Sequence, residues 1–184
     1  MSINTKLAAI MLGITLAPAS LYYSDGILSN AIAGSSTEEM AVSASVAAVC
    51  NFAGSANTLA FGPYDPTSTN ASTGVDLDAS ATFQARCTKG TTGIFTIDEG
   101  DNGTASATAP VRKVKYDATN LLTYQLYTNA GRTTVWSTGT SNDFDYVATT
   151  AAPTTFTVYG RIPKGQEDVT VGAYTDSVTI TVSY

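Results

Sequence analysis

The chain has 184 residues, enough for one domain with a real hydrophobic core. Charged residues make up 13% and hydrophobic residues 43%, while 30 residues are threonine, and this composition favours strands over helices because β-branched side chains suit a pleated sheet. The absence of histidine excludes Ser-His and Cys-His nucleophile pairs, and the net charge of −6 argues against a nucleic acid or an anionic membrane as partner.

An export signal is predicted at the N-terminus, over residues 1–33. The apolar run Leu7–Ala17 is shorter than the about 20 residues that span a bilayer, but it is typical of a secretory signal. Small residues at the −3 and −1 positions indicate two cleavage sites, after Ala19 and after Ala33, and the sequence does not choose between them. We therefore expect an exported protein with one domain over residues 34–184 and no direct membrane insertion.

Two cysteines, Cys50 and Cys87, remain after either cleavage. In an exported chain an even pair predicts a disulfide. Closing a loop of roughly 38 residues would stabilise the fold by about 4 kcal/mol in the chain-entropy model. Two free thiols and half of a metal site are the less favoured alternatives.

Alternation of apolar and polar residues predicts short strands along the rest of the chain. The first is Thr37–Cys50, in which Met40, Val42, Ala44 and Val46 share one face. The following strands are expected at Val75–Cys87, Ile94–Ile97, Val111–Tyr116, Leu121–Tyr127, Thr133–Trp136, Phe156–Ile162 and Tyr174–Tyr184. About eight short strands separated by turns predict an all-β sandwich.

The predicted terminal strand places Val178, Ile180, Val182 and Tyr184 on one face. A long apolar edge strand without a covering strand is an aggregation hazard that natural proteins normally blunt. Two explanations are open: the Thr37–Cys50 strand folds back and completes its own sheet, or it completes the sheet of a neighbouring molecule. Periodicity alone does not separate them.

Three other features have a functional and a structural interpretation. The acidic group Asp98, Glu99 and Asp101 lacks ligands that a calcium loop needs, so a polar turn is favoured. The carboxylates of Asp76 and Asp78 could serve a glycosidase, but on a strand an exposed polar face is favoured. We expect the aromatic side chains, including Trp136, to lie in the core or on the sheet faces, and no catalytic residue, metal or cofactor is predicted.

Seven motifs, in their order and spacing, resemble the spore coat protein U domain family, which includes the subunits of archaic chaperone–usher pili. The motifs are Val42–Cys50, Leu59–Pro66, Ala85–Thr88, Leu122–Tyr127, Arg132–Trp136, Thr157–Pro163 and Gly172–Tyr184. The resemblance covers residues 37–184. It implies a single incomplete immunoglobulin-like β-sandwich that lacks its last strand and carries an N-terminal donor strand.

The resemblance also implies how the missing strand is supplied. A periplasmic chaperone lends a strand, and the N-terminal segment of the next subunit then replaces it. The donor segment would be residues 37–47, with Met40, Val42, Ala44 and Val46 entering a groove. One edge of that acceptor groove would be the terminal strand, with Val178, Ile180, Val182 and Tyr184.

The function expected from this resemblance is that of a structural subunit rather than an enzyme. It would leave the periplasm through an outer-membrane usher and join neighbouring pilin subunits in an extracellular cell-surface fibre for attachment and biofilm formation. The main alternative is a self-closed secreted coat or matrix protein whose own N-terminal strand completes its sheet. A carbohydrate-acting protein that uses surface carboxylates is the second.

Overall fold

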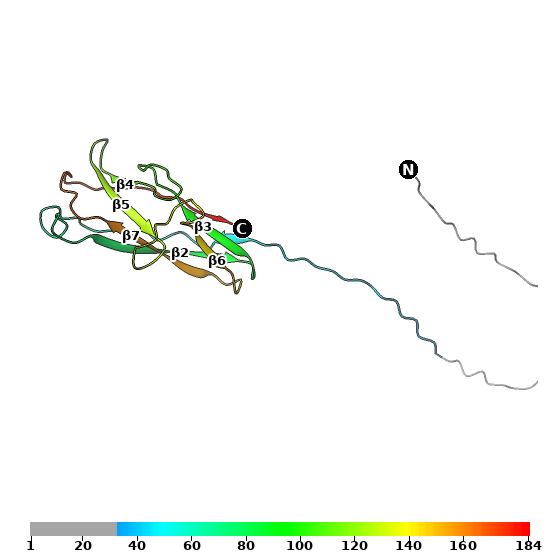
Figure 1. Cartoon of the computed structure of the whole chain (residues 1–184). Coiled ribbons are helices and arrows are strands. Elements are labelled where there is room, and N and C mark those ends of the chain that lie inside the picture. Colours follow the sequence, from blue (N-terminus) through cyan, green and yellow to red (C-terminus); the bar gives the residue numbers. More distant parts are fainter. Residues whose placement is uncertain (1–32) are drawn as a thin grey trace, which may run out of the picture. The chain divides into compact units, whose positions relative to one another are not determined.

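Eight β-strands and no helix make up the part of the chain that the computed structural model describes, residues 33–184. The strands, labelled in Figure 1, are β1 (Cys50–Phe52), β2 (Leu77–Cys87), β3 (Thr92–Ile97), β4 (Arg112–Lys115), β5 (Leu121–Tyr127), β6 (Phe144–Val147), β7 (Thr154–Ile162) and β8 (Ile180–Ser183). Over these residues no helix has the length and apolar character needed to cross a membrane. The predicted all-β class is confirmed.

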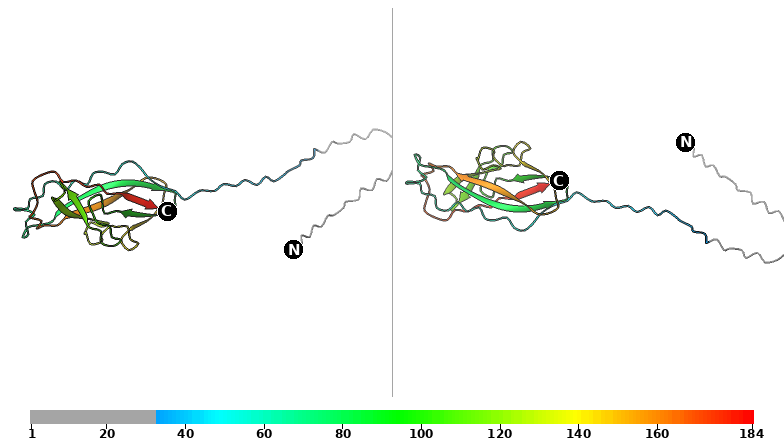
Figure 2. Two further views of the ribbon diagram at one scale, coloured as in Figure 1. Left: turned by 90° about the horizontal axis from the view of Figure 1, so that it is seen from above. Right: turned by 90° about the horizontal axis from the view of Figure 1, so that it is seen from below.

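The strands form two sheets, which Figure 2 shows as two layers from opposite sides. One sheet has the order β1-β2-β7-β5-β4 and the other has the order β6-β3-β8. Every pairing between these strands is antiparallel. The arrangement is that of an immunoglobulin-like sandwich, as predicted.

The longest pairing joins β2 to β7, from Leu77 opposite Ile162 to Ala85 opposite Thr154. Along β7 every second side chain from Phe156 onwards is buried, which is the period-two pattern that predicted this strand. These two strands therefore form the longest ladder of the larger sheet.

Aromatic side chains fill the space between the sheets. The rings of Phe95 and Phe156 lie 4.8 Å apart, and those of Phe83 and Phe156 lie 5.2 Å apart. Trp136 is 1% exposed, and its Nε1 donates a 2.9 Å hydrogen bond to the carbonyl oxygen of Phe95. A buried indole needs such a partner. The prediction that Trp136 belongs to the core is confirmed.

The predicted strand Thr37–Cys50 is wrong for all residues but the last. From Ala33 to Val49 the chain forms no strand and is exposed, and β1 starts only at Cys50. The described residues before Ala44 form a unit separate from the sandwich. Alternation marks a segment that can be a strand, but a strand also needs a hydrogen-bonding partner.

The predicted strand Thr133–Trp136 is also wrong, apart from one isolated bridge between Tyr127 and Val135. The side-chain oxygen of Asn129 accepts hydrogen bonds from the backbone N–H groups of Thr133 and Thr134, both at 3.1 Å. These N–H groups are therefore used in a turn and not in a ladder.

One strand, β6, was not predicted from the sequence. The strand has only four residues, and the exposed carboxylate of Asp145 interrupts its apolar residues, so its sequence lacks a clear strand pattern. The terminal strand was predicted over Tyr174–Tyr184, and its ladder, β8, covers the second half of that range. The predicted signal sequence, residues 1–33, lies outside the described residues except for Ala33.

Candidate functional site

A groove of about 1390 Å³ opens between the edges of the two sheets. One side of it, here called the N-terminal wall, is residues 52–66, and the other, the terminal wall, is residues 169–180. Its floor is made of core side chains: Phe83, Ile97, Leu122, Tyr124, Leu126, Val158 and Ile162. These side chains are each 6% exposed or less, so the groove is a hollow that reaches the hydrophobic core from one side of the sandwich.

The terminal wall directs alternate side chains inward. Val178 and Ile180 are half-buried and line the groove. Val182 is half-buried too, but it packs against the disulfide beyond the end of the groove lining. Tyr184 is 60% exposed and is not part of the lining.

The backbone of the terminal wall is hydrogen-bonded on one side. Thr175 exchanges two hydrogen bonds with Lys115, and the carbonyl oxygens of Ser177 and Thr179 accept hydrogen bonds from the loop after β3. The intervening residues Asp176 and Val178 make no backbone hydrogen bond within the described part of the chain. Successive residues of a strand present their N–H and C=O groups to opposite sides. This edge is therefore free to pair toward the groove.

The N-terminal wall has a free edge as well. After β1 the chain continues along β2, where the N–H of Ala53 donates to Gln84 at 2.8 Å and that of Asn57 donates to Thr82 at 2.9 Å. From Thr58 to Gly62 no backbone–backbone hydrogen bond is formed within residues 33–184. The groove therefore lies between two stretches of backbone that could each pair with one further strand.

Close packing against Gly160 holds the N-terminal wall in place. A Cβ atom on Gly160 would lie 2.8 Å from Cζ of Phe61 and 3.0 Å from Cδ2 of Leu59. The ring of Phe61 also packs edge-on against that of Tyr124, with centroids 5.9 Å apart. In the sequence Leu59 and Phe61 belong to the motif Leu59–Pro66, to which no role in a groove was assigned.

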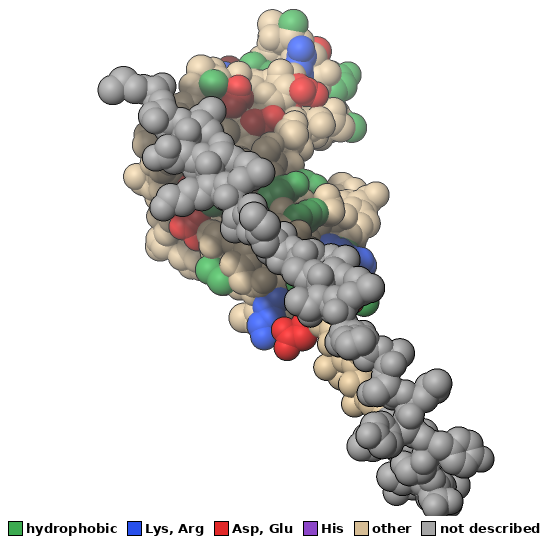
Figure 3. All heavy atoms as spheres, turned by 90° about the vertical axis from the view of Figure 1, so that its right-hand side faces the viewer, with side chains coloured by type: hydrophobic (Ala, Val, Ile, Leu, Met, Phe, Trp, Pro, Cys, Tyr) green, Lys and Arg blue, Asp and Glu red, His purple; other side chains and the backbone are tan. Residues whose placement is uncertain are grey.

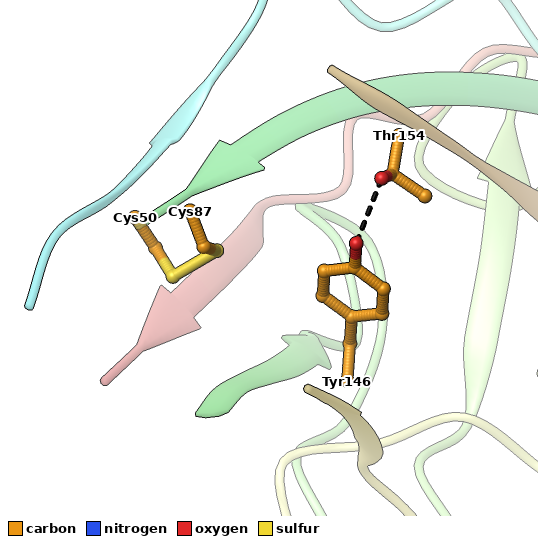
Figure 4. Close-up of a disulfide and its surroundings, with 4 residues drawn as sticks. All are labelled: Cys50, Cys87, Tyr146 and Thr154. Atoms are coloured by element: carbon orange, nitrogen blue, oxygen red, sulfur yellow. Dashed lines mark hydrogen bonds between the residues drawn. A yellow bond between two sulfur atoms is a disulfide. The ribbon is translucent and has the colours of Figure 1, made fainter. Parts of the chain in front are cut away.

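The predicted disulfide between Cys50 and Cys87 is confirmed. It joins the opposed residues of β1 and β2, and Figure 4 shows it beside β8. Ala148, Tyr146 and Val182 pack around it. Tyr146 is itself held by a 2.8 Å hydrogen bond between its hydroxyl and that of Thr154. Side chains therefore fill the space between the sheets at the end of the sandwich that carries the disulfide.

One charged side chain, Asp176, lines the otherwise uncharged terminal wall. Its Oδ2 accepts a 2.7 Å hydrogen bond from the hydroxyl of Tyr124, and its Oδ1 accepts bonds from Asn102 N at 3.2 Å and Asn102 Nδ2 at 2.9 Å. Burial and the hydrogen bond to Asp176 raise the pKa of Tyr124 well above its ordinary value, so the phenol remains a donor. We call Asp176, Tyr124 and Asn102 the Asp176 cluster.

Sequence reasoning missed Asp176, although its position in the alternation could have identified it. It lies on the same parity as Val178 and Ile180, where a carboxylate interrupts an apolar face. The acidic group Asp98, Glu99 and Asp101, for which a calcium loop was the functional interpretation, instead supports the terminal wall. Asp98 Oδ1 accepts hydrogen bonds from Gly100 N at 3.0 Å and Thr179 N at 2.8 Å. Over the described residues, no three His, Cys, Asp or Glu side chains gather as metal ligands would.

The two carboxylates of β2 and its approach, Asp76 and Asp78, pair with arginines. Arg161 Nε donates to Asp78 Oδ1 at 2.8 Å, and Arg161 Nη1 lies 3.3 Å from Asp76 Oδ2. Arg132 Nη1 lies 3.2 Å from Asp78 Oδ2. The hydrogen bond from Arg161, with the charge of Arg132, lowers the pKa of Asp78. This arrangement ties β2, β7 and the turn at Arg132 together.

The residues predicted for the donor segment are exposed. Met40, Val42 and Val46 are 84%, 88% and 84% exposed, and Ala44 is exposed too. Such exposure of three large apolar side chains on one parity is unusual for a folded protein. Figure 3 shows hydrophobic side chains at the surface of the molecule next to acidic and basic ones.

The similarities to solved structures are weak. A chaperone–tip adhesion subunit complex of archaic chaperone–usher Csu pili from Acinetobacter baumannii matches with a TM-score of 0.49 and 15% identity, over 76% of this chain. A chaperone–tip adhesin complex of CFA/I fimbriae matches with a TM-score of 0.37 and 13% identity, over 68% of this chain. In both cases the match spans 40% of the solved chain.

The similarities in sequence are stronger. The model of the Spore Coat Protein U domain matches residues 36–181. Protein U of Myxococcus xanthus is 32% identical over 161 residues, which cover 85% of this chain and 89% of that protein. The match extends from the exposed N-terminal segment through both walls of the groove. The chain belongs to the Spore Coat Protein U domain family.

Proposed function

We propose that this chain is a structural subunit of an extracellular fibre of the archaic chaperone–usher type, which polymerises by donor-strand exchange. The observation that carries the proposal is the groove with a free backbone edge on each side. A single inserted strand would form hydrogen bonds with both edges and cover the groove. Residues 37–47 of a neighbouring subunit are the proposed donor segment.

The dimensions and chemistry of the donor segment fit the groove. Met40–Val46 has seven residues and spans about 23 Å as a strand, and the wall from Tyr174 to Ile180 also has seven residues. Met40, Val42, Ala44 and Val46 would face the apolar floor, while Ser43 and Ser45 face away. Their burial would contribute on the order of 5 kcal/mol as an upper estimate.

That contribution alone would not make a durable fibre. Withdrawal of the donor segment would leave the half-buried apolar side chains of the two walls, including Leu59, Phe61 and Val178, without their partner. Dissociation would therefore be limited by a high barrier to unfolding, and the fibre would be kinetically stable.

The proposal requires export through the periplasm, a periplasmic chaperone and an outer-membrane usher. An unfilled groove is an exposed apolar surface with two free strand edges, which invites aggregation. A chaperone that lends a strand would protect this surface until the next subunit arrives. Surface attachment and biofilm formation are the proposed roles of the fibre, and no catalytic role is proposed.

The alternative from a different class is a self-closed coat or matrix protein. The name of the family, with its reference to the spore coat, is the observation that favours it. In such a protein the segment at Met40–Val46 would complete the sheet of its own chain. The exposure of Val42 and Val46 supports exchange with another molecule instead.

Matched aspartate variants test the proposal. Val42→Asp or Val46→Asp would place an unpaired charge against the groove floor, which costs several kcal/mol, so we expect these proteins to fold with their chaperone and not to polymerise. Ser43→Asp and Ser45→Asp introduce the same charge on the outward face and should polymerise normally. Assembly is measured by size-exclusion chromatography and by SDS gels of unheated samples. Normal polymers from Val42→Asp would refute the proposed donor segment.

A further inference from the structure

The inward face of the terminal wall is not uniform. Its half-buried positions from residue 174 onwards are Tyr174, Asp176, Val178 and Ile180, all of which line the groove. Asp176 alone among these four is charged, and it is fixed by Tyr124 at 2.7 Å and by two bonds from Asn102. An added Cβ at Gly100 would lie 2.2 Å from its Oδ2, so the carboxylate is also confined from behind. A strand that enters the groove must pass this fixed charge.

We propose that Asp176 determines the register of the inserted strand, and that the small side chain of Ala44 from a second copy of this chain lies beside it. The inference rests on the proposed function, because it specifies how Met40–Val46 occupies the same groove. It names Asp176 as a specificity-determining residue, which selects a small or a cationic side chain at its level.

The direction of the inserted strand follows from the sandwich. Every strand pairing in the described structure is antiparallel, including that of β8 with β3. The strand that completes an antiparallel sandwich next to β8 is expected to run antiparallel to it as well. With Ala44 opposite Asp176, Val42 is then opposite Val178 and Met40 is opposite Ile180.

This register places all four inward donor residues against groove-lining positions. The fourth, Val46, is opposite Tyr174, whose hydroxyl is anchored to the carbonyl oxygen of Thr170 at 2.8 Å. The four donor positions therefore match the inward part of the wall from Tyr174 to Ile180.

The two neighbouring registers that keep the same face inward fit less well. A shift of two residues in one direction moves Met40 to Val182, which packs against the disulfide outside the groove lining, and moves Val46 onto Asp176. A shift in the other direction moves Val42 onto Asp176 and Val46 onto Gly172. An added Cβ at Gly172 would lie 2.6 Å from the ring of Tyr116, so that end is already crowded.

The chemistry of Asp176 also favours alanine at its level. Three donors occupy its two oxygens, and because the residue is only half-buried, solvent water has access to the carboxylate in the empty groove. A valine or methionine beside it would remove that water without offering a hydrogen bond, which is costly for a carboxylate. Alanine fills the least space and leaves the carboxylate hydrated.

Engineered cysteine pairs test the register directly, since the native cysteines are joined in the disulfide. The outward residues Ser43 and Ser177 face each other in the proposed register, so the full chain with Ser43→Cys and Ser177→Cys should give covalent oligomers on non-reducing SDS gels. Two double variants are the matched controls. Ser45→Cys with Ser177→Cys brings two cysteines face to face only if the register shifts by two residues. Ser43→Cys with Thr175→Cys does so only if the register shifts by two residues in the opposite direction.

The outcomes separate the register from the proposed function. Covalent ladders from the Ser43/Ser177 pair alone support the inference. Polymers that cross-link through either shifted pair, or through none, overturn the register and leave strand exchange intact. An intramolecular cross-link in a monomer, or the absence of polymers from the unmodified chain, overturns both.

A charge reversal supplies a second readout. With Asp176 beside position 44, Ala44→Lys should assemble about fivefold more readily than Ala44→Glu, because opposite charges across a strand pair attract and like charges repel. The same two substitutions in an Asp176→Asn background should assemble equally. Equal assembly of Ala44→Lys and Ala44→Glu in the natural background would overturn the role of Asp176.

Discussion

Arg112 and Trp136 are linked in the interior by a 2.8 Å hydrogen bond from Nη2 of the guanidinium to the tryptophan carbonyl oxygen. The Arg112 side chain is 0% exposed, and its other partners are the carbonyl oxygens of Ile97 and Asp98 and the side-chain oxygen of Gln125. Burial lowers the pKa of Arg112. A buried guanidinium thus joins β4, β5, the end of β3 and the turn at Trp136.

Replacing Arg112 should destabilise the sandwich. Arg112→Met removes the donors for three buried or half-buried carbonyl oxygens, and we expect a loss of about 3 kcal/mol in the free energy of unfolding. The control is Lys115→Met on the exposed end of the same strand, which should change stability by less than about 0.5 kcal/mol. Urea denaturation measures both. Equal stability of the two variants would show that the buried hydrogen bonds of Arg112 are dispensable.

A methyl group at position 160 should displace the N-terminal wall. Gly160→Ala places a carbon within 3.0 Å of both Leu59 and Phe61, so the wall must move or the domain must strain, at a cost of about 1–3 kcal/mol. We expect a folded protein with an intact disulfide and markedly reduced polymerisation. Gly131→Ala is the matched control, because its added carbon meets nothing nearer than 3.5 Å. Polymerisation of Gly160→Ala at the rate of the unmodified protein would contradict the role of this wall.

Loss of the disulfide should sharply lower the yield of folded protein. Cys87→Ser releases β1, which has only three residues to hold it against β2, and the chain-entropy model puts the loss at about 4 kcal/mol. The yield of folded protein from an oxidising compartment measures this effect. A reducing agent should destabilise the unmodified protein to a similar extent and leave Cys87→Ser unaffected. An undiminished yield of Cys87→Ser would contradict this prediction.

Stability should be constant between about pH 5 and pH 8 and should fall in acid. The chain has no histidine to titrate in that range. Hydrogen bonds lower the pKa of Asp65, Asp78 and Glu167, and backbone N–H donors lower that of Asp117 to about 2. Groups with lowered pKa values stabilise the fold above their ordinary pKa, and this contribution is lost as the pH falls from about 4 toward 2.

The contribution of one carboxylate to the acid transition can be isolated. Asp78→Asn removes the ion pairs with Arg132 and Arg161, so it should be less stable than the unmodified protein at pH 7 and lose less stability on acidification. Asp145→Asn is the control, because this exposed carboxylate forms no ion pair in residues 33–184. Thermal unfolding at pH 7, 4 and 2.5 measures both. An unchanged acid transition in Asp78→Asn would contradict the assignment.

Features encoded in short stretches of sequence could be predicted. The strand Leu121–Tyr127 was predicted with the bounds that β5 has, and the cysteine pair was predicted from its context in an exported chain. The inward parity of Val178 and Ile180 also followed from alternation alone. Each of these depends on neighbours within the same segment.

Features that depend on distant contacts could not be predicted. The hydrogen bond between Tyr124 and Asp176 joins residues 52 positions apart, and the bonds of Arg112 reach three separate segments. The segment before Cys50 has the alternation of a strand, but whether it forms one depends on a partner that its own sequence does not specify. The same dependence makes this segment the proposed donor.

The most direct test of strand exchange compares the purified full chain with a version that lacks the residues up to Val46. Unheated samples of the full chain should run as a ladder of SDS-resistant oligomers, and the truncated version should retain the groove and not assemble. A full-length monomer that unfolds more easily once truncated would contradict strand exchange, because the segment would then complete the sheet of its own chain.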